Sequence, residues 1–342
     1  MYKLSIIIPI FNAEKTLKKT INNIINQSFG FDNIELILID DKSTDKTIDI
    51  MKNYSKKYNN IKTILLDKNT GGPSIPRNKG IEKATADYLI FMDSDDEIFN
   101  DYCEVLYNKI INNNTDIVNC NDCRKLNKNY YISKSINTIN TTEIMVNNWD
   151  KLLFRHTAWG NIYRKSLIKD NHIRFPNTLH EDGFFSLKCL LSTKKPVIQL
   201  PNYPGYIYTI EDDESISHKI SLNTFNKFIE GYELCEDLLK KNTPSHIIHE
   251  ISSTYIKMAI FTLIKLNDID KGIKRLYEFE ETFDFNIILK SKPLNMINRK
   301  LIEGKFTQVK IILMIIKMLY YNKKIKNLIF IKYSNLKILN EN

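Results

Sequence analysis

The sequence predicts an α/β protein with a doubly wound sheet, followed by a mostly helical C-terminal region. In the first part of the chain, short apolar runs alternate with segments of helical periodicity. The apolar runs are continuous, which is typical of parallel strands buried on both faces. From about Ser221 the pattern becomes mostly helical without a turn-rich linker. We therefore expect an α/β domain over residues 1–220 and a helical, basic region over residues 221–342.

The first strand is predicted at 4–10, and the helix after it at 14–27, where Leu17, Ile21 and Ile24 fall at helical spacing. Right-handed crossovers between parallel strands bring their carboxyl ends to one edge of the sheet, where open α/β sheets bind ligands. Further strands are predicted at 34–39, 61–66 and 88–92, with helices at 44–58 and 74–84. The shared edge would hold Pro9 and Phe11, Asp40 and Asp41, Asn69 to Gly72, and Asp93 and Asp95.

Beyond residue 96 the alternation is less regular. The polar stretch 127–140 is rich in Asn and Ser, and we expect a surface loop or hairpin there. The other elements predicted in this part are a helix at 102–112, a strand at 116–120, a helix that begins at Glu181, and short strands at 197–200 and 206–209.

The composition is that of a soluble globular protein, with 342 residues, 43% of them hydrophobic and 26% charged. Met1 leads directly into a strand pattern, so we expect no secretory signal. No run reaches the roughly 18 uncharged apolar residues of a membrane-spanning helix. The five cysteines show no disulfide pattern and suit a reducing compartment. We expect a cytoplasmic protein.

The net charge of +9 is confined to one part of the chain. The segment 299–337 holds ten Lys or Arg and one acid, Glu303, whereas the remainder holds 39 basic and 39 acidic residues. The basic character therefore belongs to the C-terminal segment, and we expect no nucleic-acid partner. An apolar stripe at helical spacing runs through this segment, with lysines around it: Val309, Ile312, Ile316, Leu319 and Tyr320.

Two interpretations of this stripe stay open. The helices could pack on the rest of the protein or on a second copy of the chain, which would make a homo-oligomer. Alternatively, the stripe and its basic rim could dock on the anionic inner face of the plasma membrane, or the basic surface could hold a polyanionic acceptor. Our hypothesis is that segment 299–337 localises the protein to such a negatively charged surface or acceptor.

Asp93, Asp95 and Asp96 follow directly after the predicted strand at 88–92. Carboxylates crowded this closely repel each other unless a cation lies between them. A hard divalent cation that also holds phosphate oxygens would satisfy them. An acidic turn without a ligand is the alternative, since Asp-x-Asp alone is a weak signal.

Other residues at the same edge have both a binding and a structural interpretation. Asp41 could accept a hydrogen bond from a pyrimidine imide, or it could cap the helix predicted at 44. The Gly71-Gly72 turn would let backbone approach a ligand closely. Arg77 could reach a phosphate or form a buried structural ion pair. The chain has no P-loop motif, and no glycine-rich dinucleotide motif follows its first strand.

Glu181 and Asp182 open a predicted helix. The helix dipole at this position lowers the pKa of a carboxyl group and keeps it ionised. An ionised carboxylate facing the crevice could accept a proton from an incoming hydroxyl. Capping of the helix is the structural alternative.

Taken together, the sequence resembles the family 2 glycosyltransferases, which have the nucleotide-sugar-binding GT-A fold. The resemblance covers roughly residues 3–220. Within the family, 71–78 and 162–168 are most similar to the bacterial transferases that add N-acetylglucosamine to poly(ribitol phosphate) wall teichoic acid. The resemblance is carried by the motifs Ile8 to Asn12, Ile39 to Asp45, Asn69 to Pro73 with Arg77 and Asn78, Asp93 to Asp96, and Glu181 with Asp182.

The resemblance implies roles at the nucleotide end of the site. Pro9, Phe11 and Asp41 would hold the uracil and ribose of a UDP-sugar. Asn69 and Arg77 would line the nucleotide pocket.

It also implies roles at the reacting end. Asp93 and Asp95 match the metal-binding motif, with Asp95 favoured as the ligand of Mn²⁺ or Mg²⁺. Asp182 matches the catalytic base of inverting members. Ser215 and Ser217 fall in the loop that contacts the pyrophosphate. Four acidic residues precede this loop, where a basic residue is common in relatives, and this departure weakens the loop's assignment.

The implied activity is an inverting, metal-dependent transfer of a sugar, a hexose or N-acetylhexosamine, from a UDP-sugar. The acceptor would be a hydroxyl of a bacterial cell-surface glycan, such as a capsule or wall polymer, or of a teichoic-acid-like polyol phosphate. Two other functions remain open on the residues alone. A nucleotidyltransferase also uses strand-end carboxylates with a metal, but it would not need a base at Asp182. A non-enzymatic module could bind polyanions or membranes through the basic segment.

Overall fold

The computed structural model describes two compact units. Unit 1 comprises Met1–Asn177, Glu181–Ile210 and Lys337–Asn342, and unit 2 comprises Thr178–His180 and Glu211–Leu336. The domain boundary expected at residue 220 falls in a stretch, 210–220, that lies outside the described residues. The described residues are 1–126, 129–133, 142–144, 157–209, 221–266, 268–282, 297, 300, 303, 305, 307–313 and 336–339.

An eight-stranded sheet forms the centre of unit 1, with the strand order β3-β2-β1-β4-β10-β6-β11-β9. The first four strands are parallel, as predicted, so their carboxyl ends share one edge. β10 runs antiparallel to both of its neighbours, which makes the second half of the sheet mixed. The strands are β1 (Leu4–Ile10), β2 (Ile34–Asp40), β3 (Ile61–Leu65), β4 (Tyr88–Phe91), β6 (Ile117–Cys120), β9 (Thr142–Ile144), β10 (Asn161–Arg164) and β11 (Val197–Leu200).

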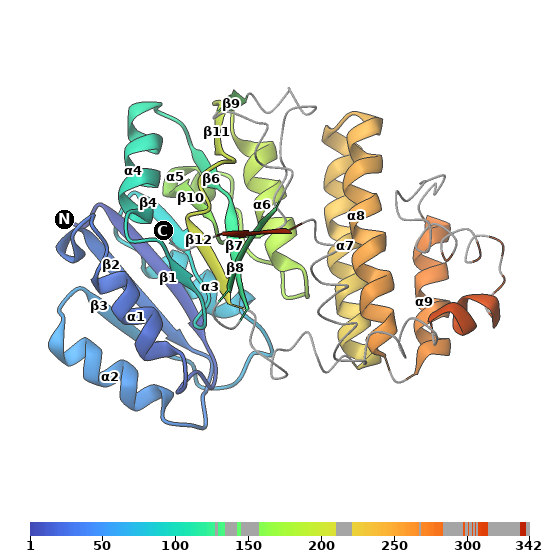
Figure 1. Cartoon of the computed structure of the whole chain (residues 1–342), viewed down its shortest axis with the longest axis horizontal. Coiled ribbons are helices and arrows are strands. Elements are labelled where there is room, and N and C mark those ends of the chain that lie inside the picture. The colour runs from blue at the N-terminus through green and yellow to red at the C-terminus, as the bar shows by residue number, and fades with distance from the viewer. Residues whose placement is uncertain are drawn as a thin grey trace. The chain divides into compact units, whose positions relative to one another are not determined.

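Helices cover both faces of this sheet (Figure 1). Alternate side chains of β1, such as Ile6 and Ile8, join a core with helices α1 (Leu17–Ile25), α2 (Thr47–Lys57) and α4 (Tyr102–Asn112). On the other face, Gly80 of α3 lies so close to Ile7 that an added Cβ would meet its Cγ2 at 2.3 Å. Phe91 contacts Phe185 of α6 there, with ring centroids 5.3 Å apart. The remaining bounds are η1 (Phe31–Asn33), α3 (Ser74–Lys83), α5 (Lys165–Asp170) and α6 (Glu181–Ser192).

The first helix is shorter than the segment 14–27 that its periodicity predicted. Glu14 lies outside it because its backbone N–H is bound by the Asp45 carboxylate at 3.0 Å, so it belongs to a turn that ties the two loops together. Leu17, Ile21 and Ile24 are buried, as the spacing indicated.

A second, five-stranded sheet in the order β13-β8-β7-β12-β5 lies beside the acidic turn. β12 pairs antiparallel with β5, through Tyr206 with Ile98, and this pairing brings β12 close to residues 93–96. Of the stretch 127–140, where a loop or hairpin was expected, only 129–133 is described; it forms β8, which pairs antiparallel with β7 just before the stretch. The bounds are β5 (Glu97–Ile98), β7 (Asp122–Leu126), β8 (Asn129–Ser133), β12 (Tyr206–Thr209) and β13 (Leu336–Leu339).

The long described elements of unit 2 are helices, as the C-terminal pattern predicted, whereas residues 336–339 of the region expected to be helical form strand β13. Unit 2 contains α7 (Leu222–Asn242), α8 (Ser245–Lys265) and α9 (Ile269–Thr282), and α7 and α8 run side by side (Figure 1). Ser221 caps α7, because its hydroxyl accepts the backbone N–H of Thr224 at 3.1 Å. None of the described helices combines the length and apolarity needed to cross a membrane.

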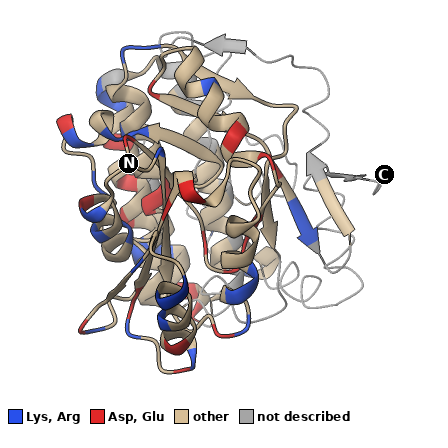
Figure 2. Cartoon of the chain, turned by 90° about the vertical axis from the view of Figure 1, so that its left-hand side faces the viewer, with Lys and Arg blue, Asp and Glu red and all other residues tan. Residues whose placement is uncertain are grey.

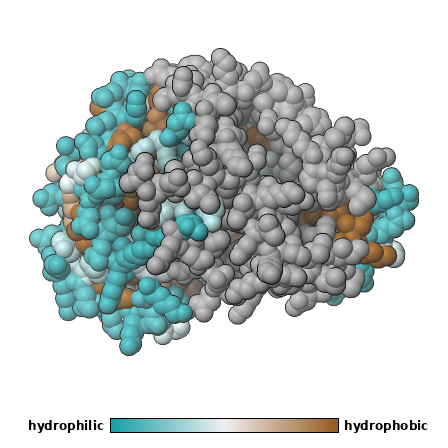
Figure 3. Space-filling view, viewed as in Figure 1, coloured by the Kyte–Doolittle hydropathy of each residue, from teal (hydrophilic) through white to brown (hydrophobic). Residues whose placement is uncertain are grey.

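A short part of the basic segment is described within unit 2. Val309 is buried, and Lys310 forms an ion pair with Asp270 at 2.6 Å, so this part packs within the unit. Ile316, Leu319 and Tyr320 of the apolar stripe lie outside the described residues. Lys and Arg are interspersed with Asp and Glu over the described elements in the view of Figure 2. The visible described surface of unit 1 is mainly hydrophilic (Figure 3).

Candidate active site

A buried arginine joins three carboxylates from distant parts of the sequence. Arg77, on the first turn of α3, is 2% exposed. Its Nη2 donates to Asp93 Oδ1 at 2.8 Å, directly after β4. Its Nη1 donates to Glu181 Oε1 at 2.9 Å and also to Asp182 Oδ1, at the start of α6. We call these four residues the Arg77 cluster.

The cluster holds more negative than positive charge, and burial changes its protonation. Burial, and after it the neighbouring Asp182 charge, raise the pKa of Glu181 to about 8, although Arg77 opposes the rise. Burial also raises the pKa of Asp182, although Arg77 opposes this rise. The hydrogen bond that the two carboxyls share raises the pKa of Glu181 and lowers that of Asp182. Asp182 is therefore the carboxyl of this pair that ionises first.

This result corrects one electrostatic expectation from the sequence. The helix N-terminus was expected to lower the pKa of Asp182, whereas desolvation inside the cluster raises it. The Asp182 side chain is 17% exposed and that of Glu181 is 9% exposed, so Asp182 is the more accessible to a second substrate. Asp182 also accepts a hydrogen bond from the backbone N–H of Ala158.

Glu181→Gln is expected to change how stability depends on pH. In the folded protein Glu181 keeps its proton up to about pH 8, whereas its ordinary pKa is 4.5, so its stabilising contribution is complete below pH 4.5 and is lost as the pH rises through about 8. Gln mimics the neutral acid and does not ionise. The melting temperature of the variant relative to that of the wild type should therefore rise across this range, measured without metal or nucleotide. Glu82→Gln, at an exposed position on α3, is the control, and parallel pH profiles of Glu181→Gln and wild type would contradict the assignment.

The acidic turn after β4 divides its three carboxylates between two environments. Asp95 is exposed and the Asp93 side chain is 31% exposed, whereas Asp96 is buried. Asp96 accepts hydrogen bonds from the Tyr206 hydroxyl at 2.7 Å and the Thr209 N–H at 2.8 Å. The Tyr206 hydroxyl in turn accepts the backbone N–H of Asp93 at 3.2 Å. Asp96 and Tyr206 therefore hold the turn in place through hydrogen bonds on its buried side. Sequence reasoning missed this role because the contact depends on the pairing of β5 with β12.

The turn suits a cation that is bound together with a ligand. Within the described ranges, no three or more His, Cys, Asp or Glu side chains are grouped so that they could hold a metal ion. Asp93 and Asp95 therefore supply at most a partial set of oxygen ligands. Mg²⁺ is commonly held by one or two carboxylates plus substrate phosphates and water, and the residues present fit that pattern.

The loops after β2 and β3 meet around Asp41, which is 3% exposed. Its carboxylate accepts the Thr70 N–H at 2.9 Å, and its carbonyl accepts from the Asn69 side-chain amide at 3.0 Å. Asp41 therefore does not cap α2, the structural alternative considered above. Burial raises the pKa of its carboxyl.

The end of β1 lies next to this loop pair, because the Asp41 N–H donates to the carbonyl of Ile10 at 2.8 Å. Phe11 follows β1 and is 48% exposed, which leaves its ring accessible to a flat ligand. Pro9 lies within β1, paired with Ile39. Ser215 and Ser217 lie outside the described residues.

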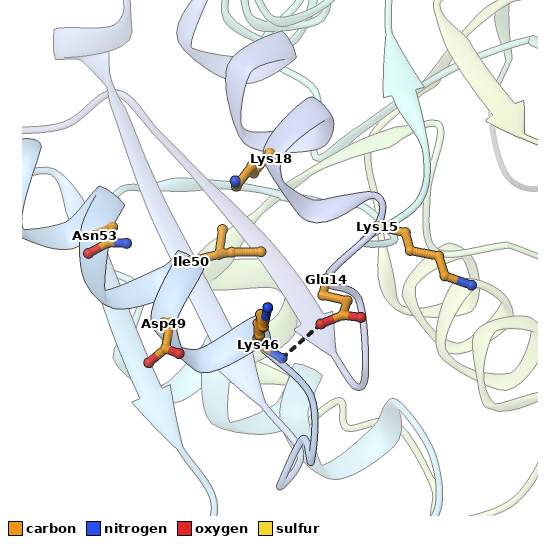
Figure 4. Close-up of a pocket in the computed structure, with 7 residues that line it drawn as sticks. All are labelled: Glu14, Lys15, Lys18, Lys46, Asp49, Ile50 and Asn53. Atoms are coloured by element: carbon orange, nitrogen blue, oxygen red, sulfur yellow. Dashed lines mark hydrogen bonds between the residues drawn. The ribbon is translucent and has the colours of Figure 1, made fainter.

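A surface cavity of about 440 Å³ lies between the N-terminal parts of α1 and α2 (Figure 4). In it, the Glu14 carboxylate accepts the backbone N–H of Lys46 at 3.1 Å. Its lining carries charges of both signs and shares no residue with the Arg77 cluster or with the Asp41 loop pair. We assign the candidate site to those two groups, because the carboxyl ends of the parallel strands meet there. The lining residues are Glu14, Lys15, Lys18, Lys46, Asp49, Ile50 and Asn53.

Comparison with known proteins identifies relatives along most of the chain. The model of a family described as glycosyl transferase family 2 matches residues 5–171. The Staphylococcus aureus poly(ribitol-phosphate) beta-N-acetylglucosaminyltransferase TarP is 31% identical over 234 residues, which is 67% of this chain and 69% of TarP. The cholesterol galactosyltransferase of Borreliella burgdorferi is 30% identical over 334 residues, covering 84% of this chain and 89% of that protein.

Solved structures show the same fold. The crystal structure of S. aureus TarS 1–349 in complex with UDP superimposes with a TM-score of 0.71 at 22% sequence identity. The match covers 94% of this chain and 93% of the TarS chain. A further structure of TarS 1–349 was determined in complex with UDP-GlcNAc.

Proposed function

The chain belongs to glycosyl transferase family 2, and on this premise we propose that it transfers a sugar from a UDP-sugar to a hydroxyl of a bacterial cell-surface glycan or teichoic-acid-like polymer. The transfer inverts the anomeric carbon and depends on a divalent cation. One observation carries the proposal: Arg77 brings a strand-end carboxylate, Asp93, together with a helix-start carboxylate, Asp182. A candidate metal ligand and a candidate base therefore share one buried arginine.

The nucleotide of the donor lies at the loops after β1, β2 and β3. Asp41 holds the uracil through its carboxylate, Asn69 braces the same loop, and the exposed ring of Phe11 covers the base, with Pro9 beside it at the strand end. TarS, which has the same fold, has been crystallised with UDP and with UDP-GlcNAc, and this supports a UDP-sugar as the donor.

Asp93 and Asp95 would hold the Mn²⁺ or Mg²⁺ ion, with Asp95 as the more exposed ligand. A cation bound there would supply positive charge to neutralise the charge that develops on the UDP leaving group. Arg77 was expected to line the nucleotide pocket, and that role remains a prediction. Its described contacts match the other interpretation, a buried ion-pair residue, and they keep Asp93 and Asp182 in place.

Asp182 acts as the general base. Its carboxylate accepts the proton of the acceptor hydroxyl while the hydroxyl oxygen bonds to the anomeric carbon and the bond to UDP breaks. Attack from the face opposite to UDP inverts the configuration. Binding both substrates in one crevice supplies much of the remaining rate acceleration, because a bimolecular step becomes effectively unimolecular.

Two relatives support a polyol-phosphate acceptor. TarP acts on poly(ribitol phosphate), and so does a beta-glucosyltransferase of Bacillus spizizenii that is 32% identical over 217 residues, 63% of this chain and 33% of that protein. The hypothesis that segment 299–337 binds an anionic surface or acceptor remains a prediction, since most of that segment lies outside the described residues.

The test of the proposed function is a donor screen followed by product analysis. UDP-sugars with Mn²⁺ should raise the melting temperature more than GDP- or CMP-sugars do, because a ligand that binds only the folded state stabilises it. With poly(ribitol phosphate) as the acceptor, the reaction should release UDP. Release of pyrophosphate from a nucleoside triphosphate would indicate a nucleotidyltransferase instead. Transfer to a sterol and not to the polymer would contradict the proposed acceptor. A sterol is the alternative to test because the Borreliella relative is a cholesterol galactosyltransferase.

A further inference from the structure

The three residues that precede Glu181 and Asp182 belong to the helical unit. The segment Thr178–His180 belongs to unit 2, whereas Glu181 and the rest of α6 belong to unit 1. The chain therefore passes from unit 2 into unit 1 at the peptide bond between His180 and Glu181. Whatever fixes His180 also fixes the backbone one residue before the Arg77 cluster.

His180 is held tightly in unit 2. Its side chain is buried, and its ring lies edge-on to two tyrosines, with centroids 4.8 Å from Tyr232 and 4.9 Å from Tyr255. The two tyrosine rings stack on each other at 4.9 Å with an interplanar angle of 6°, so they form a rigid wall. Tyr232 comes from α7 and Tyr255 from α8, and both are fully buried.

The backbone of this segment is also constrained. His180 has φ of +72°, a left-handed conformation that costs a residue other than glycine on the order of 1 kcal/mol or more. Gly231 in the middle of α7 allows the segment to approach, because a Cβ there would lie 2.0 Å from the Leu179 carbonyl oxygen. A glycine inside a helix costs about 1 kcal/mol relative to alanine, so this close approach explains its presence.

We propose that the helical unit positions the catalytic base: Gly231, Tyr232 and Tyr255 clamp Leu179 and His180, and the clamp sets the backbone from which Asp182 reaches the acceptor hydroxyl. Gly231 and His180 are positioning residues that touch no substrate. Within unit 1, Arg77 holds the side chains of Glu181 and Asp182, the two residues that follow His180 in the chain. Clamp and arginine together leave the carboxylate little freedom, as general-base catalysis requires. This inference rests on the proposed role of Asp182.

Gly231→Ala tests the clamp, because the new methyl group must push the Leu179 carbonyl away. We expect kcat to fall by about ten- to hundredfold, the scale of a displacement of about 1 Å at a reacting group. The Kd of the UDP-sugar with Mn²⁺ should stay within about twofold, because Asp41, Asn69 and the acidic turn belong to unit 1.

The matched control is Gly272→Ala in α9 of the same unit. A Cβ at Gly272 would meet the ends of the Leu263 and Leu266 side chains at 2.3 and 2.5 Å. This substitution therefore disturbs the packing of unit 2 at a place that does not include the clamp residues. The proposal requires that Gly231→Ala lowers kcat much more than Gly272→Ala does, while the two variants bind the UDP-sugar with the same Kd. Equal kcat in the two variants would overturn it.

If Gly231→Ala does not fold, His180→Ala and His180→Phe decide the question. Phe restores a flat ring against Tyr232 and Tyr255, so it should recover most of the kcat that Ala loses, and failure of this recovery would overturn the proposal. Asp182→Asn separates the two levels of inference. If the wild-type protein transfers no sugar, the proposed function fails. If Asp182→Asn transfers sugar within a few-fold of the wild-type rate, the assignment of Asp182 as the base fails, and the clamp inference that rests on it fails too. If Asp182→Asn is inactive but Gly231→Ala and His180→Ala are fully active, only the clamp inference fails.

Discussion

Asp182→Asn is expected to retain UDP-sugar binding while transfer falls by roughly a hundredfold or more, the scale of general-base contributions. The asparagine amide keeps the size of the carboxylate but cannot accept the acceptor's proton. Donor binding should survive, because the proposed nucleotide contacts are at Asp41 and Asn69. The measurements are kcat with the polymer acceptor and the calorimetric Kd of the UDP-sugar with Mn²⁺.

Asp49→Asn provides the control for this experiment. Asp49 is an exposed carboxylate in the first turn of α2, so it occupies a comparable helix position without belonging to the Arg77 cluster. This variant should transfer sugar at the wild-type rate. Transfer by Asp182→Asn within a few-fold of wild type would refute its assignment as the base.

Asp95→Asn should weaken Mn²⁺-dependent UDP binding strongly. Loss of a residue that merely orients a metal ligand costs about 10- to 100-fold in affinity, and loss of a ligand should cost at least as much. The fold should be unaffected, because Asp95 is exposed whereas the buried Asp96 holds the turn. Titration calorimetry of UDP with and without Mn²⁺ measures the effect.

Two comparisons make this result specific. Binding of UDP without Mn²⁺ should be the same in Asp95→Asn and wild type, so only the metal-dependent part changes. Asp170→Asn, an exposed carboxylate at the end of α5, should bind UDP with Mn²⁺ as the wild type does. An unchanged Mn²⁺-dependent affinity in Asp95→Asn would remove this residue from the metal site.

Local patterns predicted the part of the molecule that depends on local physics. Continuous apolar runs such as Ile6 to Ile8 are typical of strands in a sheet that is covered on both faces. Helical crossovers between such strands make neighbours parallel, and their carboxyl ends then share one edge. Asp41, Asn69 and Asp93 were predicted at that edge for this reason. The structure confirms the parallel strands, and the Asn69 side-chain amide donates a hydrogen bond to the Asp41 carbonyl at that edge.

Local patterns carried no signal for the reversal of β10, because strand direction in a mixed sheet depends on its neighbours and not on its own residues. For the same reason the sequence left Arg77 between two interpretations. Its partners Glu181 and Asp182 are 104 and 105 residues away, and only the folded chain shows that all three share one buried space.

The sequence by itself determined the strand-and-helix order from β1 to β4, the acidic turn after β4 and the carboxylates at the start of α6. Each of these features depends on residues that are close together in the sequence. The tertiary structure alone decided that the pKa values of Glu181 and Asp182 are raised, because desolvation depends on what surrounds a group. It also decided that Tyr206 of β12 supports Asp96, and that Gly231 of α7 lies against Leu179. These contacts join residues that are far apart in the sequence. They contribute to stability only after folding has buried both partners together.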